Sequence, residues 1–430
     1  MASLNNKTVI LGGGLAGIST AFHLKNENYL LVEREAHLGG TARSYTLAGF
    51  TFDFTGHLLH LHNPYTKKLI SQLLKNNFFS CVRKSAIFSH GVYTKYPFQA
   101  YTSGLPEHIV DDCVLGFYEA IKDVPSKKID FKSWCLKLFG KGISDHFMIP
   151  YNSKLYQISP EQMTPDWCGS FVPKPKFEEV IHGALSQHDL SFGYNTSFLY
   201  PKKGGIQVLA EKLGENLKNI ALNTSVEKIF WKKKEIVLTD KTIVRYSNLV
   251  NTIPLLEFIR KLDPIPPDIR DMSKNLKFSS IMCLNMGINR AKISDLSWVY
   301  FPEKKYPFYR VGFPMNFTPH IVPKNSSSMY VEIPMRYAEK LSKDELLAEV
   351  HKSLIEARIL KKSDRISVAH FLPIKYAYVI YDKNRKKILN KIFSFMKRHS
   401  MQSIGRYGAW KYSFMEEAIL DGKKAAEQIS

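Results

Sequence analysis

A glycine-rich turn near the N-terminus constrains the fold of this chain more than any other feature. A short β-rich run, Lys7–Leu11, leads directly into it. The turn has the pattern G-x-G-x-x-G, formed by Gly12, Gly14 and Gly17, and a stretch with helical periodicity follows. In such a unit the first glycine makes the tight turn, the second lets a pyrophosphate approach the backbone, and the third lets the helix pack closely on the strand. The sequence therefore predicts a β–α–β unit that binds a dinucleotide.

The residues that follow this turn are also expected to contact the dinucleotide. Leu15 and Ala16 begin the helix, so free backbone N–H groups should face the phosphates there. The second apolar run ends at Glu33, whose carboxylate can accept hydrogen bonds from both hydroxyls of a ribose. A glycine-rich turn without a ligand is the alternative, but the combination of two strands, a helix and an acid favours the dinucleotide.

A second glycine pair, Gly39 and Gly40, follows Glu33 closely. Arg34 and Arg43 flank this segment, and Arg34 and Thr41 are further expected contacts. A nicotinamide dinucleotide does not need a second phosphate-facing glycine pair. The segment resembles that of two-dinucleotide-binding-domain flavoproteins of the amine-oxidase type, and this resemblance implies FAD rather than NAD.

Length and charge limit the remaining interpretations. At 430 residues the chain is long for a single hydrophobic core, which predicts two or three domains. The chain carries 60 Lys and Arg against 39 Asp and Glu, and its net charge of +21 suits phosphate-bearing ligands, nucleic acid or an anionic membrane surface. Because the lysines are spread along the chain with only short runs such as WKKKE, we expect no nucleic-acid partner. Peripheral membrane contact and oligomerisation stay open.

The cysteines and the apolar runs bear on the cellular location. The five cysteines are scattered and form no CxxC pair, which argues against a disulfide framework or a zinc cage and fits a reducing cytosol. No signal peptide is evident, and no apolar run reaches the about 18 residues that a transmembrane helix needs. We therefore expect a cytoplasmic protein without an integral membrane segment.

The order of helical and strand patterns predicts an α/β fold in three parts. A Rossmann-like FAD-binding domain is expected to be discontinuous, with residues 1–65, 194–275 and 398–430. Residues 66–193 have mostly helical patterns and are expected to form an inserted helical domain. Residues 276–397 combine β-rich runs with a helix that opens on a capping box, and form the expected antiparallel-sheet substrate domain.

Several segments in fixed order carry a closer resemblance. They are GFTFDFTGHLLHLHN, VYTKYPFQ, HFMIPYNSKLY, YNTSFLYPKKGG, VYFPEKKYPFYR, YAYVIYD and GRYGAWKYSFMEEAILDG. They span nearly the whole chain and resemble the UDP-galactopyranose mutase family, in particular its eukaryotic-type branch and related bacterial flavoproteins of sugar gene clusters. The glycine motifs indicate only a flavoprotein, whereas YPFQ, FYR and GRYGAWKY are more specific.

The resemblance implies a redox-neutral isomerisation in polysaccharide or glycan precursor biosynthesis. In that family the N5 atom of reduced FAD attacks the anomeric carbon of a nucleotide sugar. The nucleoside diphosphate leaves, the sugar changes between pyranose and furanose rings, and the diphosphate returns. An external reductant such as NAD(P)H is one way to keep the flavin reduced. The alternatives are an FAD-dependent oxidoreductase of the amine-oxidase or protoporphyrinogen-oxidase type, and a flavin-binding assembly factor without catalysis.

The resemblance also assigns residues to the substrate. Arg310, at the end of YPFYR, matches the arginine that clamps the diphosphate, so a catalytic role is expected of it; a surface salt bridge is the alternative. Each of the other assigned residues has a plain core or rim position as its alternative. These expected substrate contacts are Tyr151, Asn152, Lys174, Asn195, Tyr378, Tyr381 and Tyr412.

Two further segments are expected at the flavin. His57, in TGH, matches a flavin-facing loop in which a histidine packs by the isoalloxazine and helps to control its reduction. Arg406 is expected beside the FAD diphosphate, and a final helix from near Phe414 would direct its positive N-terminus at the pyrimidine edge. The flavin contacts expected in these segments are Gly56, His57, Gly405, Arg406, Phe414 and Met415.

One segment departs from the family pattern. A second diphosphate arginine is usual after the tryptophan of the helical domain, but DWCGSFVPKPK has Ser170 and Phe171 there. Lys174 or Lys176 could replace it only as a point charge, not as a planar fork. The departure leaves the nucleotide and the sugar open.

Three histidines, His57, His60 and His62, raise the question of a metal site. In an extended run His60 and His62 share one face and His57 points to the other. No cysteine or carboxylate lies nearby at ligand spacing, so we expect no metal. We expect His60 to support the loop and His62 to be structural.

Overall fold

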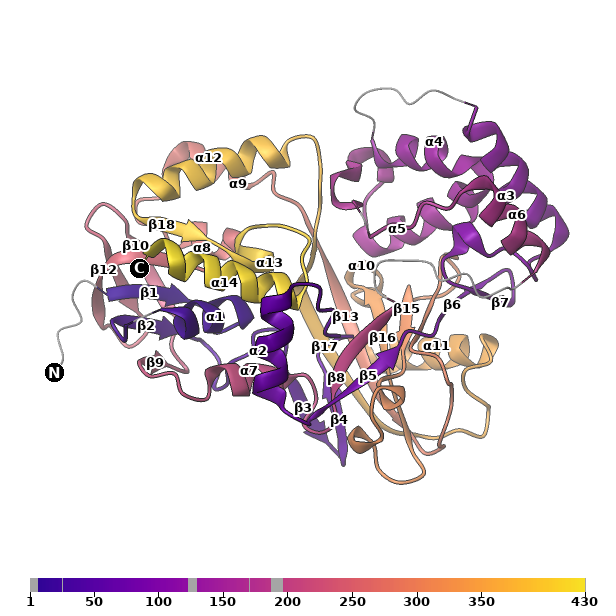
Figure 1. Ribbon diagram of the computed structural model, residues 1–430, viewed down its shortest axis with the longest axis horizontal. Helices are drawn as coiled ribbons and strands as arrows, with labels where there is room; N and C mark the ends of the chain where they lie inside the picture. Colours follow the sequence, from indigo (N-terminus) through magenta and orange to yellow (C-terminus); the bar gives the residue numbers. More distant parts are fainter. Residues whose placement is uncertain (1–6, 25, 123–129, 170, 187–195, 430) are drawn as a thin grey trace.

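The computed structural model describes residues 7–24, 26–122, 130–169, 171–186 and 196–429 (Figure 1). Within them, two seven-stranded sheets lie next to each other, and a separate group of helices covers one end of the second sheet. Every described helix is too short or too polar to cross a lipid bilayer.

The first sheet contains the predicted β–α–β unit. Its strands in spatial order are β10 (Val226–Phe230), β11 (Glu235–Leu238), β12 (Ile243–Asn251), β1 (Lys7–Leu11), β2 (Tyr29–Val32) and β9 (Ile220–Ala221), with β18 (Met401–Ser403) also paired to β12. β1 pairs in parallel with both β12 and β2, and is almost wholly buried because helices cover the sheet. The WKKKE run forms the tip between β10 and β11.

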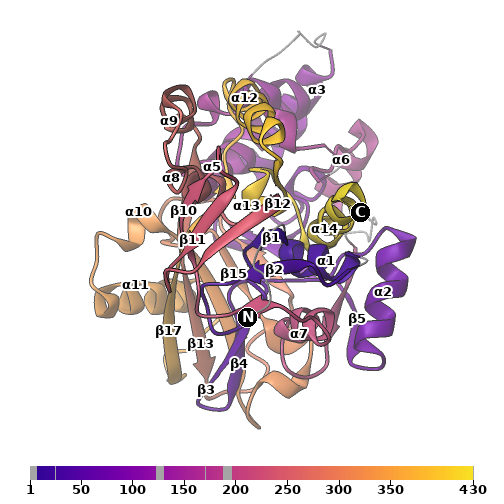
Figure 2. The ribbon, with the colours of Figure 1, turned by 90° about the vertical axis from the view of Figure 1, so that its left-hand side faces the viewer.

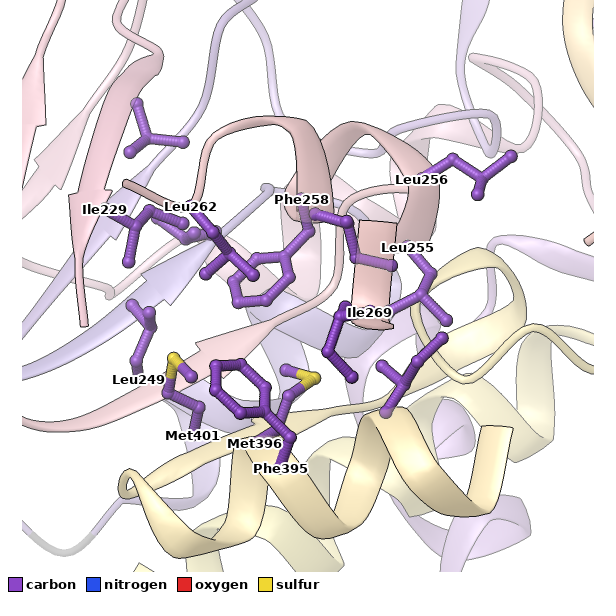
Figure 3. Packing of buried hydrophobic residues seen from close by; sticks show 14 of the residues in the cluster. Ile229, Leu249, Leu255, Leu256, Phe258, Leu262, Ile269, Phe395, Met396 and Met401 are labelled. Carbon is purple, nitrogen blue, oxygen red and sulfur yellow. The ribbon is translucent and has the colours of Figure 1, made fainter. Parts of the chain in front are cut away.

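Two sets of helices cover this sheet. The first set is α1 (Leu15–His23), α7 (Gln207–Gly214) and α14 (Met415–Ile429), and the second is α8 (Leu255–Arg260), α9 (Pro267–Ser273) and α12 (Arg385–Arg398). Figure 2 shows α8, α9 and α12 together, apart from α1, α7 and α14. In the second set, Phe258, Ile269 and Phe395 pack over Leu249 of β12 (Figure 3).

The second sheet is mainly antiparallel, as expected. Its order is β17 (Ile366–Val379), β13 (Phe278–Ile288), β16 (Ser327–Pro334), β15 (Arg310–Gly312), β14 (Trp298–Tyr300), β6 (Ser85–Ser89) and β7 (Val92–Lys95), and only β14 and β6 pair in parallel. α10 (Met335–Ala338) and α11 (Lys343–Glu356) follow β16. The predicted capping box opens α11, because Ser342 and Glu345 exchange hydrogen bonds there.

The remaining elements complete the fold. The helical group consists of α3 (Glu107–Ala120), α4 (Phe131–Ile143), α5 (Ile149–Tyr156) and α6 (Phe177–Leu185), at the upper right of Figure 1. The other elements are α2 (Pro64–Leu74), α13 (Gly405–Gly408), the hairpin of β3 (Ser44–Leu47) and β4 (Phe50–Asp53), and the pair of β5 (Phe78–Val82) and β8 (Ser197–Pro201).

The domain limits expected from the sequence remain a prediction, but two segments pack across them. β6 and β7 lie within residues 66–193, yet β6 pairs with β14 of the second sheet. α12 lies within residues 276–397, yet Ile388, Ile392 and Phe395 on its apolar face join the core of the first sheet. The reason is physical: each buried face is covered by the nearest apolar partner in space, whichever segment supplies it.

Candidate flavin and substrate site

The two glycine-rich segments meet at the carboxyl ends of β1 and β2. Gly39 N donates a hydrogen bond of 2.7 Å to Gly13 O, and Gly14 forms a parallel bridge with Gly39. A Cβ on Gly40 would lie 3.1 Å from Gly14 Cα, so side chains would fill the space where these backbones approach. This cradle of backbone, at the N-terminus of α1, suits a phosphate group.

Glu33 holds the turn in place. Its carboxylate is almost buried and accepts hydrogen bonds from Gly13 N at 2.6 Å and Glu35 N at 2.9 Å. Glu33 therefore has a structural task as well as the expected ribose contact. Arg34 turns the other way: its side chain is 76% exposed and pairs with Glu35 at 3.1 Å.

The first turn of α1 lies against this cradle. Leu15 and Ala16 are both buried there, and Thr41 lies half-buried in the turn after the second glycine pair. Gly405 approaches from the C-terminal segment, since a Cβ on it would lie 2.9 Å from Ala16 Cβ. Contacts of these four residues with a pyrophosphate stay a prediction, and the close approach of Gly405 to Ala16 shows that the C-terminal segment reaches the start of α1.

Arg43 was not among the expected site residues. Its guanidinium lies 4.7 Å from the ring centre of Phe54, and its Nε is buried without a hydrogen-bond partner among the described residues. Its side chain lines the second glycine pair, because a Cβ on Gly39 would lie 2.8 Å from Arg43 Cγ. A buried cationic N–H that lacks an acceptor fits a phosphate oxygen of a dinucleotide. The signal in the sequence was the run GGTAR, which places an arginine just after the glycine pair.

The TGH segment lies between β4 and α2 and packs on the second sheet. A Cβ on Gly56 would lie 2.2 Å from Tyr330 Oη, so only glycine lets this loop rest on β16. His57 Nδ1 lies 3.3 Å from Thr55 Oγ1. Burial lowers the pKa of His57 to about 4, and the positive charges of Arg406 and Arg310 act in the same direction. His57 is therefore neutral at pH 7 and lies within electrostatic reach of both arginines.

Arg310 is held by a buried carboxylate. Glu332 lies beside it on β16 and accepts from Arg310 Nε at 2.9 Å and from Nη2 at 2.6 Å. The side chains are 21% exposed for Arg310 and 1% for Glu332, so this is not an ion pair of the surface. Within the described residues the fork uses Nε and Nη2, which leaves Nη1 for another acceptor.

Arg406 lies with the expected substrate tyrosines. Its guanidinium lies 5.3 Å from the ring centre of Tyr378 and 5.2 Å from that of Tyr412. It donates hydrogen bonds to Ser413 O and, at 3.1 Å, to Ala377 O. Its side chain is thus directed to the tyrosines, while Gly405 faces α1, and a contact of Arg406 with the FAD diphosphate stays a prediction.

The other tyrosines form the walls around these arginines. Tyr151 packs edge-on against Tyr300, with ring centres 5.4 Å apart. Tyr381 accepts a hydrogen bond of 2.9 Å from Tyr412 N, while Arg385 lies over its ring at 3.8 Å. The hydroxyl of Tyr381 thereby fixes the backbone that carries Tyr412.

Two of the other expected substrate residues, Asn152 and Lys174, make contacts within the helical group. Asn152 is buried and donates 2.7 Å to Met148 O of its own helix. The ammonium of Lys174 lies 5.8 Å from the ring centre of Trp134 in the helical group. Asn195 lies outside the described residues.

An aromatic ring is found near the position of the missing arginine. Phe171 lies 5.2 Å from Tyr412 and 6.0 Å from Phe414, measured between ring centres, while Ser170 lies outside the described residues. The ring adds an apolar wall beside Tyr412, at the point where the family pattern usually has a second diphosphate arginine.

The final helix binds the end of the segment that contains the three histidines. α14 begins at Met415, as expected, and Glu416 in its first turn is buried. Its Oε1 accepts from His62 N at 2.8 Å, from Asn63 N at 2.9 Å and from the hydroxyl of Thr66. This carboxylate, which the sequence patterns did not indicate, anchors the end of the run to the helix that should face the flavin.

The three histidine rings have different neighbours. His60 Nδ1 lies 3.2 Å from Ser197 O, and the ring of His62 lies 6.5 Å from that of Phe414. Among the described residues, no group of three or more His, Cys, Asp or Glu side chains could hold a metal ion. The run is therefore a loop support in this structure.

We expect these histidines to make the protein acid-sensitive. Burial lowers the pKa of both His57 and His60 to about 4, below the value of about 6.5 in an unfolded chain. The unfolded chain then binds more protons between these values, so the free energy of unfolding falls as pH drops from about 6.5 to 4. Urea unfolding over this range should show a loss on the order of 2 kcal/mol that is reduced in a His57→Gln, His60→Gln double variant. An unchanged pH dependence in that variant would assign the loss to other groups.

Comparison with known proteins now identifies the family. Residues 15–430 match the family described as flavin containing amine oxidoreductase. The chain belongs to this family. It is thus a flavoprotein, as the glycine motifs predicted.

Solved structures show the same fold. The chain superimposes on reduced UDP-galactopyranose mutase with a TM-score of 0.93 and 24% identity, covering 99% of this chain and 95% of the other. A protoporphyrinogen oxidase-like protein of Exiguobacterium superimposes with a TM-score of 0.76 and 17% identity, covering 99% of this chain and 98% of the other. Putrescine oxidase bound to putrescine superimposes with a TM-score of 0.71 and 16% identity, covering 99% of each chain. The expected α/β fold with a dinucleotide-binding unit is confirmed.

Proposed function

We propose that this flavoprotein is an FAD-dependent mutase that interconverts the pyranose and furanose forms of a nucleotide sugar. The observation that supports it most is the convergence of two half-buried arginines, Arg310 and Arg406, with tyrosines beside the His57 loop. A detached nucleoside diphosphate must be held during ring opening, and cationic and hydroxyl donors are the groups that hold it.

The cofactor position follows from the glycine cradle. The backbone around Gly14 and Gly40 and the free Nε of Arg43 would hold the pyrophosphate of FAD, and Glu33 its ribose. When bound, reduced FAD supplies the nucleophile of the mutase reaction, without net redox change. His57, neutral at pH 7, would pack against the ring without adding charge.

The protein's own groups then have separate tasks. Glu332 orients the fork of Arg310, so that Nη1 can donate to a phosphate oxygen. The ring centres of Tyr378 and Tyr412 lie 5.3 and 5.2 Å from the guanidinium of Arg406, and their hydroxyls would donate to the same group. The aromatic walls exclude water, which would otherwise hydrolyse a sugar separated from its diphosphate.

A net oxidoreductase is the second candidate, because the family is one of amine oxidoreductases. The charge of the site bears on this choice. Arg310 is balanced by Glu332, while Arg406 is bound by carbonyl oxygens and aromatic rings. The site therefore keeps a net positive charge, which opposes a protonated amine and favours an anionic substrate.

The decisive test uses the flavin's oxidation state. Dithionite-reduced protein, incubated without oxygen with a panel of UDP-, TDP- and GDP-sugars, should convert one of them to its ring isomer, detected by chromatography. The same protein with oxidised flavin is the matched control and should be inactive. A second arm with NADPH or NADH in place of dithionite tests the external reductant.

Two results of this experiment would contradict the proposed mutase. Consumption of oxygen with formation of peroxide, on an amine or a porphyrinogen and without isomerisation of any nucleotide sugar, would replace the mutase with the oxidase. Protein that contains no flavin after purification and reconstitution would contradict both.

A further inference from the structure

Lys154 is a half-buried cation outside the residues assigned so far. It lies on α5, and its ammonium donates to three carbonyl oxygens: Phe301 O at 2.9 Å, Glu303 O at 2.9 Å and Phe308 O at 2.6 Å. An ammonium has three N–H donors, so these bonds use all of them. All three partners belong to the loop that joins β14 to β15.

This loop leads directly to Arg310. Phe308 is followed by Tyr309 and then by Arg310, the first residue of β15. The loop closes as Phe301 N donates to Tyr309 O at 2.9 Å, and Tyr309 N donates to Glu332 O at 3.1 Å. The carbonyls bound by Lys154 are therefore part of the same hydrogen-bonded turn that ends at the Arg310–Glu332 pair.

The same helix reaches the wall of the site. Tyr151, three positions before Lys154, packs edge-on against Tyr300 at 5.4 Å and Tyr309 at 6.1 Å, which flank this loop. Residues three apart lie on one face of a helix. One face of α5 thus packs Tyr151 against the loop and directs the ammonium of Lys154 to its carbonyl oxygens.

On this basis we propose that Lys154 is a positioning residue, whose ammonium holds the 301–308 loop so that Arg310 can present its free edge to a diphosphate. This inference rests on the proposed function for the identity of the ligand. The contact joins the helical group to the second sheet, so the placement of Arg310 depends on how these two parts are docked.

The three loop carbonyls compensate the loss of water around the ammonium of Lys154. Burial lowers the pKa of Lys154 to about 7, while the charge of Glu303 acts in the opposite direction. The carboxylate of Glu303 itself is directed to His90 N at 3.0 Å and to Lys305 at 3.4 Å. The loop carbonyls, rather than a carboxylate, therefore compensate the buried charge of Lys154.

The test compares Lys154→Met, which keeps the length of the side chain but removes the donors, with Lys132→Met. Lys132 is an exposed lysine of the same helical group, paired with Glu161. Lys154→Gln, which keeps two N–H donors, serves if Lys154→Met does not fold. Calorimetric binding of UDP and of inorganic pyrophosphate to the flavin-loaded protein should weaken about 10-fold in the Lys154 variants, and KM should rise with a smaller change in kcat. Amide hydrogen exchange in residues 301–310 should become faster, and Lys132→Met should match the wild type in each measurement.

The outcomes separate the two proposals. Unchanged binding of both anions in Lys154→Met or Lys154→Gln would overturn the role of Lys154, whether or not exchange in the loop changes. Wild-type protein that binds neither UDP nor pyrophosphate would overturn the proposed function instead. In that case, faster exchange confined to residues 301–310 would still support Lys154 as the holder of the loop, and unchanged exchange would overturn it.

Discussion

Replacement of Arg310 with alanine should lower kcat/KM for the nucleotide-sugar substrate by about 100- to 1000-fold, because it removes a charge-assisted donor to the diphosphate. The same change should reduce the free energy of unfolding by about 3–5 kcal/mol, since Glu332 would remain buried with its charge uncompensated. Steady-state kinetics of the reduced enzyme and urea unfolding measure the two effects.

A double variant separates stability from binding. In Arg310→Met with Glu332→Leu both charges are gone, and replacement of a buried pair by apolar residues is often neutral for stability. We expect urea unfolding close to that of the wild type, with binding of UDP still lost. If the double variant bound UDP as the wild type does, Arg310 would have no part in the site.

Gly17→Ala should prevent correct folding of the dinucleotide-binding unit. A Cβ on Gly17 would lie 1.9 Å from Gly12 O, and a backbone oxygen in a tight turn cannot move aside without separating α1 from β1. We expect loss of at least about 3 kcal/mol in the free energy of unfolding, or insoluble protein. Thermal unfolding and the soluble yield measure this.

Gly14→Ala is the matched control within the same motif. Gly14 has φ −73° and ψ 174°, which alanine adopts readily, and its Cβ would lie 3.9 Å from the nearest atom, Gly40 Cα. The apoprotein should therefore unfold like the wild type, while the methyl group enters the cradle and reduces the flavin bound per chain at least about 10-fold. Full flavin content in Gly14→Ala, read from the visible spectrum, would remove this cradle as the pyrophosphate site.

The local elements were largely predictable because their signals are short-range. The β–α–β unit follows from glycines whose spacing allows few other structures, and the start of α11 from the capping box at Ser342. The assignment of β6, β7 and α12 to parts of the fold was not predictable in this way. Which sheet a strand joins, or which core a helix covers, depends on partners far away in the sequence.

In the candidate site, too, some features were predictable from the sequence and others were not. Arg310, Tyr378 and Tyr412 were selected by resemblance, and the structure brings them around Arg406 and the His57 loop. The packing of Arg406 between Tyr378 and Tyr412 could not be derived from its motif, since Tyr378 lies on β17, a strand distant in the sequence.

The sequence by itself determined the glycine-lined dinucleotide turn, since glycine spacing and an acid at a strand end are local constraints, and its resemblance to flavoproteins of the amine-oxidase type indicated the flavin. Only the tertiary structure decided which carboxylates and cations hold the site. Glu332 orients Arg310, Glu416 anchors the histidine run, and Lys154 ties the loop before Arg310. Each of these is a buried charge whose partner lies on another element. Such a charge is tolerated only where the fold supplies that partner, and its position therefore becomes known only when the chain is folded.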